Sequence, residues 1–456
     1  MEDYSSATLK AYIKYIDGVA TLGLSGKGLS RVPDAVTELG EVGRLVLSDN
    51  NLTELSTSIN KLKNLTSLYL SENKLAELPP EICDLKELET LSVSSNQLVG
   101  LPSSIEKLNK LKYLRLRRNN LKELPAGVGD LMELTKLDVS ENQLVGLPTT
   151  VKKLNKLKEL YLDGNKITEL PPDIFYLKEL IALNVGMNQL VVLPSNIQKP
   201  SKLTWLNLKQ NELTELPAEI GDLKELGSLN VSNNQLVGLP TSIQKLDKLG
   251  ELFLDNNKLK TLPAEIGDLK ELWWLNVSNN QLVGLPGSLQ KLNKLQVLHV
   301  DKNELTELPV EIGDLKELRE LSVSNNQLVG LPTSLQRLNK LEVLNLDRNK
   351  LRELPAGIGD LIELRNLSVS NNQLVGLPTS MQKLGELEKL YLCNNKLTEL
   401  PAGIGDLKEL SWLYVSGNPL NFDAIRFVQK LKNKRTFIKT DIAGEQGYFQ
   451  LSLKIG

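Results

Sequence analysis

The stretch Leu91-Ser92-Val93-Ser94-Ser95-Asn96-Gln97-Leu98 contains the pattern that decides the fold. Leu91 and Val93 alternate with polar residues, which is the period of a short strand with one buried face. Asn96 then turns inward, where its amide can satisfy backbone groups that lose their partners as the chain leaves the strand. Pro102 ends the extended run, and apolar residues follow at the spacing of one or two helical turns.

The same pattern recurs every 23 residues along most of the chain. Its asparagine stands at Asn50, Asn73, Asn96 and onward to Asn418. The first unit carries Lys27 instead, and seventeen steps of 23 residues lead from Lys27 to Asn418, so there are eighteen units without insertion or deletion. A fixed period of this length predicts a solenoid whose units bury their leucines against one another. We expect an α/β fold with a parallel sheet on the concave side and short helical turns on the convex side.

The consensus unit, L-x-x-L-x-L-x-x-N-x-L-x-x-L-P-x-x-I-x-x-L-x-x-L, resembles that of intracellular leucine-rich-repeat proteins that scaffold Ras signalling, and equally that of polarity scaffolds with PDZ domains. The resemblance covers roughly residues 20–420 and implies a leucine-rich-repeat horseshoe. It also implies a cytoplasmic protein-binding scaffold without catalytic residues, because the motif residues are structural. Three positions depart from the consensus, namely Lys27 for Asn, Ser56 for Pro and Pro200 for a core Leu.

The segments outside the solenoid, which spans residues 21–418, are expected to cap it. Residues 1–20 contain Leu9, Ile13 and Ile16 at helical spacing, which predicts a capping helix. Residues 419–456 begin with Phe422, Ile425 and Val428 on one face of a second predicted helix. They continue into a basic tail without an obvious stop, which is consistent with a piece of a longer protein.

The composition excludes several classes of function. Lys and Arg number 54 against 56 Asp and Glu, so no global field draws the protein to nucleic acid or an anionic membrane. No window approaches the roughly 18 apolar residues of a membrane span, and the N-terminus lacks the apolar stretch of a secretory signal. Cys83 and Cys393 lie about thirteen repeats apart and are expected to be free thiols. These features indicate a soluble cytoplasmic monomer.

Two patterns associated with enzymes do not satisfy the requirements of their chemistry. Residues 23–28, GLSGKG, resemble a phosphate-binding loop, but Gly28 stands where that loop needs Ser or Thr. The single histidine, His299, lies four units from Cys393, about 19 Å by strand spacing, so the two cannot form a catalytic pair. We expect no catalytic residue and no cofactor.

Aspartates at one strand position in alternate units could suggest a metal ladder. These are Asp163, Asp255, Asp301 and Asp347. Two units separate Asp255 from Asp301 by about 9.6 Å, which is too far for oxygens that share one calcium at about 2.4 Å. We instead expect them to bond Ser278 and Ser324 on the intervening strands, and we expect no metal site.

The repeats alternate between two versions in a 46-residue super-repeat. Residues of the outer face are nearly identical between copies, whereas the strands vary. One strand position runs Tyr69, Arg115, Tyr161, Asn207, Phe253, His299, Asn345, Tyr391. Because both faces are solvated, absence of constraint should have let the outer residues vary as far as the strand residues, so this contrast indicates diversification of the strand face for recognition. Recent duplication with sequence exchange is the alternative explanation for the uniform outer face.

The fifth unit provides a first candidate site, which is basic. It consists of Tyr113, Arg115, Arg117, Arg118 and Lys136. Three crowded guanidinium groups repel one another in the free protein, which favours an acidic partner such as a carboxylate-rich segment or phosphopeptide. Neutralisation by the neighbouring Glu141 and Asp138 is an equally open interpretation.

Units nine to thirteen provide a second candidate site, which is aromatic. It consists of Trp205, Phe253, Trp273, Trp274 and His299. Aromatic residues make up only 4% of the chain, and the repeat assigns the core to leucines, so we expect these rings to stand in solvent. Exposed Trp and Tyr commonly anchor protein interfaces.

The sequence therefore predicts a non-catalytic protein-binding scaffold or adaptor of intracellular signalling that binds a protein partner on its concave face. The alternative is the ligand-recognition part of a pattern-recognition or immune receptor whose signalling domain lies outside this chain.

Overall fold

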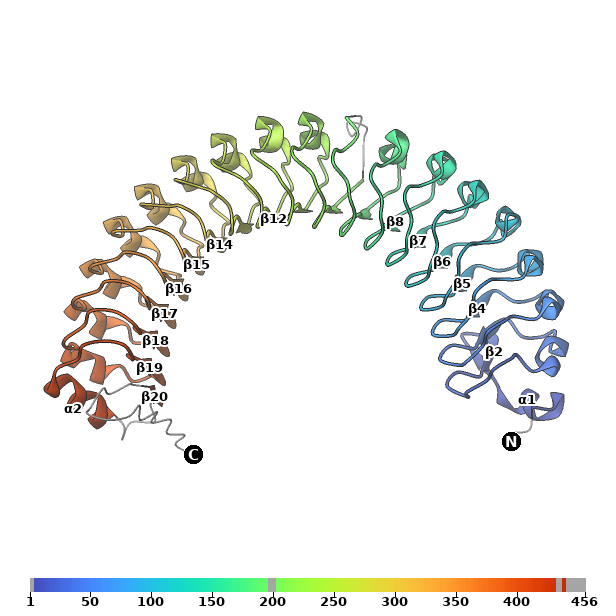
Figure 1. The fold of residues 1–456 in the computed structure, drawn as a ribbon, viewed down its shortest axis with the longest axis horizontal. Coiled ribbons are helices and arrows are strands. Elements are labelled where there is room, and N and C mark those ends of the chain that lie inside the picture. The colour runs from blue at the N-terminus through green and yellow to red at the C-terminus, as the bar shows by residue number, and fades with distance from the viewer. Residues whose placement is uncertain (1–3, 196–201, 432–436, 440–456) are drawn as a thin grey trace. The chain divides into compact units, whose positions relative to one another are not determined.

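The computed structural model describes residues 4–195, 202–431 and 437–439 (Figure 1). The chain forms two compact units, Met1–Leu226 and Gly227–Gly456. Each unit is a stack of repeats with strands along one edge and short helical turns along the other (Figure 1). Pro200, where the repeat departs from its consensus, lies outside the described residues, as does most of the basic tail.

The first unit opens with a helix and a hairpin. Helix α1 (Ser6–Tyr12) begins after Ser5, whose hydroxyl accepts the backbone N–H of Thr8, and it buries Leu9. Strand β1 (Ile13–Ile16) then pairs antiparallel with β2 (Val19–Gly23). The expectation that Ile13 and Ile16 continue a helix is therefore wrong. β-Branched residues fit a strand, and β1 covers the backbone edge that the first repeat strand would otherwise expose.

Strands β2 to β10 of the first unit pair in chain order, all parallel, with each residue opposite the one 23 positions later. After β2 they are β3 (Arg44–Val46), β4 (Ser67–Tyr69), β5 (Thr90–Ser92), β6 (Tyr113–Arg115), β7 (Lys136–Asp138), β8 (Glu159–Tyr161), β9 (Ala182–Asn184) and β10 (Trp205–Asn207). The middle residue of each strand from β3 to β10 is a fully buried leucine.

The expected helical turns are 3-10 helices. In the first unit they are η1 (Asp34–Glu38), η2 (Thr57–Lys61), η3 (Pro80–Asp84), η4 (Ile105–Lys107), η5 (Ala126–Asp130), η6 (Thr149–Lys153), η7 (Pro172–Tyr176) and η8 (Ala218–Asp222). Pro125 shows the usual start, because its carbonyl accepts the N–H of Val128 at 3.0 Å. Where Ser56 replaces this proline, its hydroxyl accepts the N–H of Ser58 at 3.2 Å and caps η2 instead.

The second unit repeats this arrangement, and its strands also pair parallel in chain order. The strands are β11 (Ser228–Asn230), β12 (Glu251–Phe253), β13 (Trp274–Asn276), β14 (Val297–His299), β15 (Glu320–Ser322), β16 (Val343–Asn345), β17 (Asn366–Ser368), β18 (Lys389–Tyr391), β19 (Trp412–Tyr414) and β20 (Phe437–Lys439). The turns are η9 (Thr241–Lys245), η10 (Ala264–Asp268), η11 (Gly287–Lys291), η12 (Val310–Asp314), η13 (Thr333–Arg337), η14 (Ala356–Asp360), η15 (Thr379–Lys383) and η16 (Ala402–Asp406).

Helix α2 (Phe422–Leu431) follows the last full repeat and begins after Asn421, whose side chain accepts the N–H of Ala424 at 2.8 Å. Its buried face consists of Ala424, Val428 and Leu431. The predicted face was wrong at Phe422, which is 71% exposed and lies beneath the guanidinium of Arg426. The first turn therefore leaves its aromatic ring outside the core.

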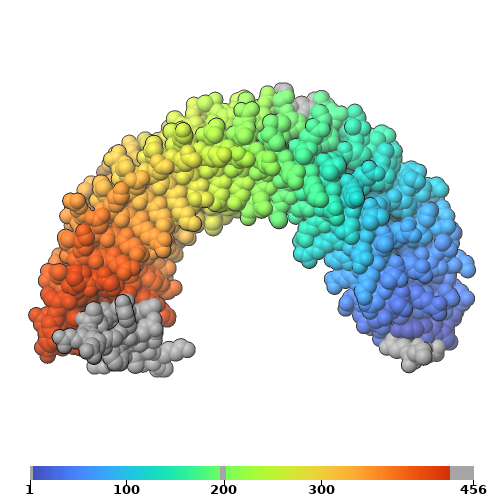
Figure 2. All heavy atoms as spheres, viewed as in Figure 1, coloured from blue at the N-terminus to red at the C-terminus, as the bar shows by residue number. Residues whose placement is uncertain are grey.

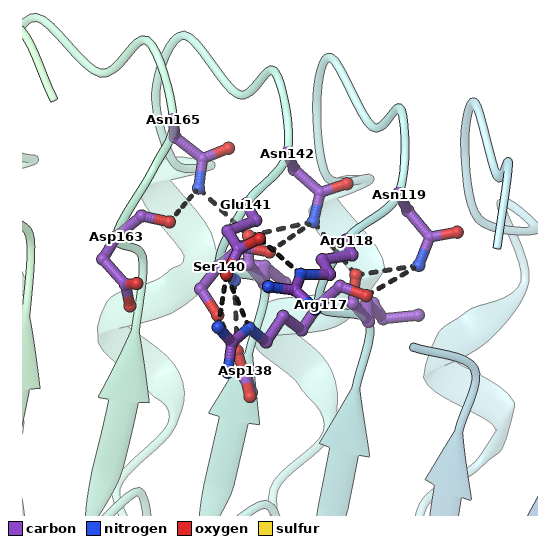
Figure 3. Close-up of polar contacts among 11 residues, drawn as sticks. Arg117, Arg118, Asn119, Asp138, Ser140, Glu141, Asn142, Asp163 and Asn165 are labelled. Atoms are coloured by element: carbon purple, nitrogen blue, oxygen red, sulfur yellow. Dashed lines mark hydrogen bonds and ion pairs between the residues drawn. The ribbon is translucent and has the colours of Figure 1, made fainter. Parts of the chain in front are cut away.

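A ladder of buried asparagines joins neighbouring repeats within each unit. Asn142 donates to the carbonyls of Val139 and Leu116, both at 3.0 Å, and accepts the N–H of Leu121 at 3.0 Å (Figure 3). Its amide thus satisfies backbone groups of its own repeat and of the preceding one. The predicted role of the motif asparagine is confirmed.

The uniform outer face has a structural cause. A Cβ atom on Gly267 would lie 2.2 Å from the backbone oxygen of Ser288 in the next repeat, so the turns can stack this closely only with glycine. Lys294 pairs with Glu271 of the preceding repeat at 2.6 Å, and equivalent pairs recur along the stack. The outer face is therefore constrained, and its uniformity does not by itself indicate that the strand face diversified for recognition.

Neighbouring repeats in each unit pack into a continuous surface on the face that Figure 2 shows. Across the part of the chain that the structure describes, no helix is long and apolar enough to cross a membrane. Both cysteines are free thiols, as expected, with Cys83 buried and Cys393 half-buried.

Candidate functional site

The exposed side chains of each strand flank its buried leucine. In β12, for example, Glu251 and Phe253 are half-buried on either side of Leu252, which is fully buried. We call the first and third residues of the repeat strands the inner face of each unit. Because successive strands are in register, these side chains form two rows across the sheet.

Two of the three crowded arginines share one carboxylate (Figure 3). Arg117 donates through Nε at 2.9 Å and through a second guanidinium nitrogen to Oε1 of Glu141, while Arg118 donates through Nε at 2.5 Å to Oε2. The hydrogen bonds from Arg118 and Arg117 lower the pKa of Glu141, and the same contact raises the pKa of Arg117. Arg117 and Arg118 are therefore neutralised by Glu141, which agrees with the second of the two interpretations of this cluster.

Lys136 is also paired. Its Nζ lies 2.6 Å from Oε2 of Glu159 and 4.7 Å from the ring centre of Tyr161. The hydrogen bond from Lys136 lowers the pKa of Glu159. Burial, together with the neighbouring Glu159 carboxylate, raises the pKa of Tyr161 to about 12, so this phenol stays protonated at neutral pH.

Arg115 differs from the other cations of the basic cluster. Its guanidinium lies 5.8 Å from the ring centre of the exposed Tyr113, and within the described residues it forms no ion pair. Asp138 stands opposite on the next strand, but its Oδ1 accepts the hydroxyl of Ser140 at 2.5 Å. The structure therefore leaves one half-buried, unneutralised guanidinium on the inner face of the first unit.

Four members of the aromatic site meet in the second unit, around Trp274. Its ring centre lies 6.1 Å from that of Phe253, 5.6 Å from that of Trp273 and 5.8 Å from that of His299. The contacts with Trp273 and His299 are edge to face, the geometry that aromatic pairs prefer. The fifth predicted member, Trp205, is half-buried in β10 of the first unit.

The rings are less exposed than the sequence predicts. Trp273 is 36% exposed, and Phe253, Trp274 and His299 are half-buried because they cover one another. The sequence pattern places side chains on a face, but it does not show how far large neighbours shield each other.

Trp274 also carries an unusual polar group. Its indole Nε1 is buried and has no hydrogen-bond partner among the residues that the structure describes. Buried donors are nearly always paired, and an unpaired one costs about 1–3 kcal/mol. The ring packing at this site is therefore maintained at the expense of a hydrogen bond.

Two carboxylates that were not predicted adjoin these rings. Glu251 is the in-register neighbour of Trp274 on the preceding strand, and Oε1 of Glu320 accepts a hydrogen bond from Nε2 of His299 at 2.8 Å. Both glutamates occupy the first position of their strands, as Trp274 does. Inspection of all first-position residues could therefore have identified them from the sequence.

A second aromatic group near the end of the second unit was also missed. The rings of Tyr391 and Tyr414 stack at 4.8 Å, and those of Trp412 and Tyr414 lie 6.3 Å apart and nearly parallel. Tyr391 and Tyr414 share one strand position in successive repeats, so the period alone predicts that they are neighbours.

The aspartate row is structural, as expected, although its partners differ in detail. Asp301 accepts the hydroxyl of Ser322 and the backbone N–H of Ser324, both at 2.6 Å. Ser278 instead donates its N–H to Asn276, so its predicted bond to an aspartate is wrong. Within the described ranges, no group of three or more His, Cys, Asp or Glu side chains could hold a metal ion.

Comparison with protein families finds three leucine-rich-repeat descriptions along the chain. "Leucine-rich repeat region" matches residues 103–186 and 251–347, "Leucine rich repeat" matches 41–98 and 362–420, and "Leucine Rich Repeat" matches 340–361. A solved leucine-rich-repeat protein of Leptospira interrogans is 35% identical, with a TM-score of 0.67, over 91% of this chain and 94% of that one. The chain belongs to the leucine-rich-repeat family.

Two plant receptors have similar structures. The ectodomain of the Arabidopsis thaliana receptor kinase GASSHO1/SCHENGEN3, solved with CASPARIAN STRIP INTEGRITY FACTOR 2, is 33% identical with a TM-score of 0.66, over 85% of this chain and 51% of that one. The plant peptide hormone receptor RGFR1, solved with RGF2, is 29% identical with a TM-score of 0.71, over 94% and 78%. Comparison with curated proteins gave no match.

Proposed function

We propose that this leucine-rich-repeat protein binds a protein or peptide partner on its concave inner face and carries out no catalysis. The observation that carries the proposal is the aromatic cluster around Trp274 on the inner face, whose core positions are already filled by leucines. Trp273, which directly precedes strand β13, is 36% exposed at the edge of this cluster. Tryptophans that remain accessible beside a complete core are typical anchors of interfaces.

The basic cluster supports a second contact region in the first unit. Arg115 lacks a carboxylate partner among the described residues, whereas Arg117 and Arg118 share Glu141. An acidic segment of the partner would give Arg115 its missing charge. It would also compete with Glu141 for the other two guanidinium groups.

Site-specific photo-crosslinking tests the proposal. A benzophenone amino acid is placed at Val297, on the inner face of β14, or at Gln290, an exposed residue of η11 in the preceding repeat. Irradiation in cells of the organism that makes the protein is expected to yield a defined adduct from position 297 and none from position 290. Adducts from position 290 alone would place binding on the outer face and overturn the proposal.

For cellular context we propose a cytoplasmic scaffold or adaptor in intracellular signalling. The support is the 23-residue repeat, which resembles scaffolds of that kind, together with the two free thiols. Cell fractionation with an antibody to the protein tests this, since recovery only from the medium or the cell surface would overturn it.

The second candidate is the recognition part of a receptor whose signalling domain lies outside this chain. It is favoured by the similarity to two plant receptors that were solved with their ligands. Sequencing the full transcript separates the two candidates, because an attached signalling domain supports the receptor and its absence supports the scaffold.

A further inference from the structure

The aromatic cluster of the second unit lies on an acidic part of the inner face. On strands β11 to β15 the inner-face positions include Glu251 and Glu320, and none of them is Lys or Arg. The aspartates Asp255 and Asp301 follow two of these strands. The basic cluster of the first unit has the opposite character, with Arg115 and Lys136 on its strands.

The two glutamates lack cationic partners of the kind that neutralise acidic side chains elsewhere. Glu251 forms no ion pair with a Lys or Arg of the described chain, and Glu320 contacts only the ring nitrogen of His299. By contrast, the nearby Glu342 pairs with Arg319, and Glu271 pairs with Lys294. The Glu251 carboxylate, beside the aromatic rings, is therefore available to an external cation, whereas Glu320 already bonds His299.

Aromatic rings and carboxylates at one place favour a cation for two separate reasons. A cation over an aromatic face gains about 0.5–2 kcal/mol, with Trp the strongest partner. A carboxylate adds a charge-assisted hydrogen bond, which is stronger than a neutral one. Trp273, 36% exposed, and Trp274, in register with Glu251, provide both groups on neighbouring strands.

We propose that Trp273, Trp274 and Glu251 form a receptor site for a cationic side chain, an arginine or lysine, of the partner protein. Glu320 lies three strands from Glu251 and adds to the negative potential of the site without contacting the same cation. The proposal rests on the inner-face binding function and specifies its chemistry in the second unit. Charge complementarity selects this occupant, because an acidic or purely apolar segment would leave Glu251 without a counter-charge.

Fluorine NMR of protein labelled with 5-fluorotryptophan tests the site directly. The four tryptophans give four resonances, which Trp→Phe variants assign. The probes are the blocked peptide Gly-Gly-Arg-Gly-Gly and its citrulline analogue, which is nearly the same shape but uncharged. The arginine peptide is expected to shift the Trp273 and Trp274 resonances saturably below about 10 mM. The Trp412 resonance is expected to stay in place and to report an intact fold.

Variants separate charge recognition from general contact. Glu251→Gln with Glu320→Gln should weaken arginine-peptide binding at least about fivefold, and so should replacing the arginine with citrulline. The matched control Glu363→Gln, an exposed carboxylate of the same unit, should not. Equal binding of the citrulline peptide, full binding by the double variant, or no shift up to about 10 mM would each overturn the proposal. If crosslinks from Val297 persist in that case, the inner-face function stands and only the cation site is wrong.

Discussion

A Cβ atom on residue 250 would lie 2.8 Å from the indole nitrogen of Trp273, so the Trp273 ring occupies the space that Gly250 leaves open. The two residues stand at the same position of successive repeats, where Gly43 and Gly227 are also glycine but most other repeats carry longer side chains. The Trp273 ring can therefore lie this close to the backbone only because the preceding repeat has glycine at this position.

Gly250→Ala is expected to displace the Trp273 ring and break its edge-to-face contact with Trp274. Near-ultraviolet circular dichroism should change, and stability should fall by about 1 kcal/mol, at the lower end for overpacking. The control Gly238→Ala, where a Cβ meets no atom within 4 Å, should change neither. An unaltered aromatic spectrum in Gly250→Ala would contradict the proposed packing.

Glu141→Gln is expected to remove an acid-sensitive contribution to stability. The arginine contacts lower the pKa of Glu141 in the folded state, so its stabilisation is present above the unfolded pKa and is lost as pH falls through the folded pKa. At neutral pH the free energy of unfolding of the wild type should exceed that of the variant by at most about 1 kcal/mol. The two stabilities should converge as the pH falls below the lowered folded-state pKa of Glu141.

Urea unfolding at neutral and acid pH measures this difference. Glu123→Gln, an exposed glutamate of the same unit, is the control and should differ little from the wild type at either pH. A Glu141→Gln deficit of the same size at both pH values would show that the carboxylate charge is not responsible.

Asn142→Ala is expected to destabilise the first unit by about 1–3 kcal/mol, because it leaves the buried N–H of Leu121 unpaired. The carbonyls of Val139 and Leu116 each lose one of two donors, since Asn165 and Asn119 still donate to them. The neighbouring Asn120 is exposed, and its alanine variant should stay within about 0.5 kcal/mol of the wild type. Denaturant titration compares them. Equal stabilities would mean that the ladder contributes little.

Met187→Asn is expected to stabilise the protein by about 0.5–1 kcal/mol. Met187 is 52% exposed and has a φ of 54°, a left-handed conformation that Asn adopts more easily than Met. Met187→Ala keeps the backbone cost and should give no gain. If both variants gain equally, the effect comes from removing the side chain, not from the backbone.

The repeat and its core could be predicted from the sequence because a 23-residue period fixes which residues face inward. The buried leucines and the role of Asn142 follow from that period alone. Local departures could not be predicted in the same way. The strand at Ile13–Ile16 depends on pairing with β2, which helical spacing does not reveal.

The candidate sites were predicted as groups of residues but not as contacts. The period places Trp274 beside Phe253 and His299, and the structure brings these rings together. The repeat period could not show that Arg117 and Arg118 share Glu141, because that contact depends on side-chain conformations. Glu251 was missed because attention to aromatic residues excluded the charged residues of the same row.

Calorimetric titration of the crosslinked partner, once identified, tests the central claim of recognition by the inner face most directly. The protein variants are Trp274→Ala and, as a control, Lys294→Ala, which removes only an ion pair with Glu271. Both are first confirmed to be folded by thermal melting. We expect Trp274→Ala to weaken binding at least about 30-fold, the loss of an interface anchor, and Lys294→Ala to change it less than about twofold. Wild-type affinity in Trp274→Ala with a large loss in Lys294→Ala would contradict the account.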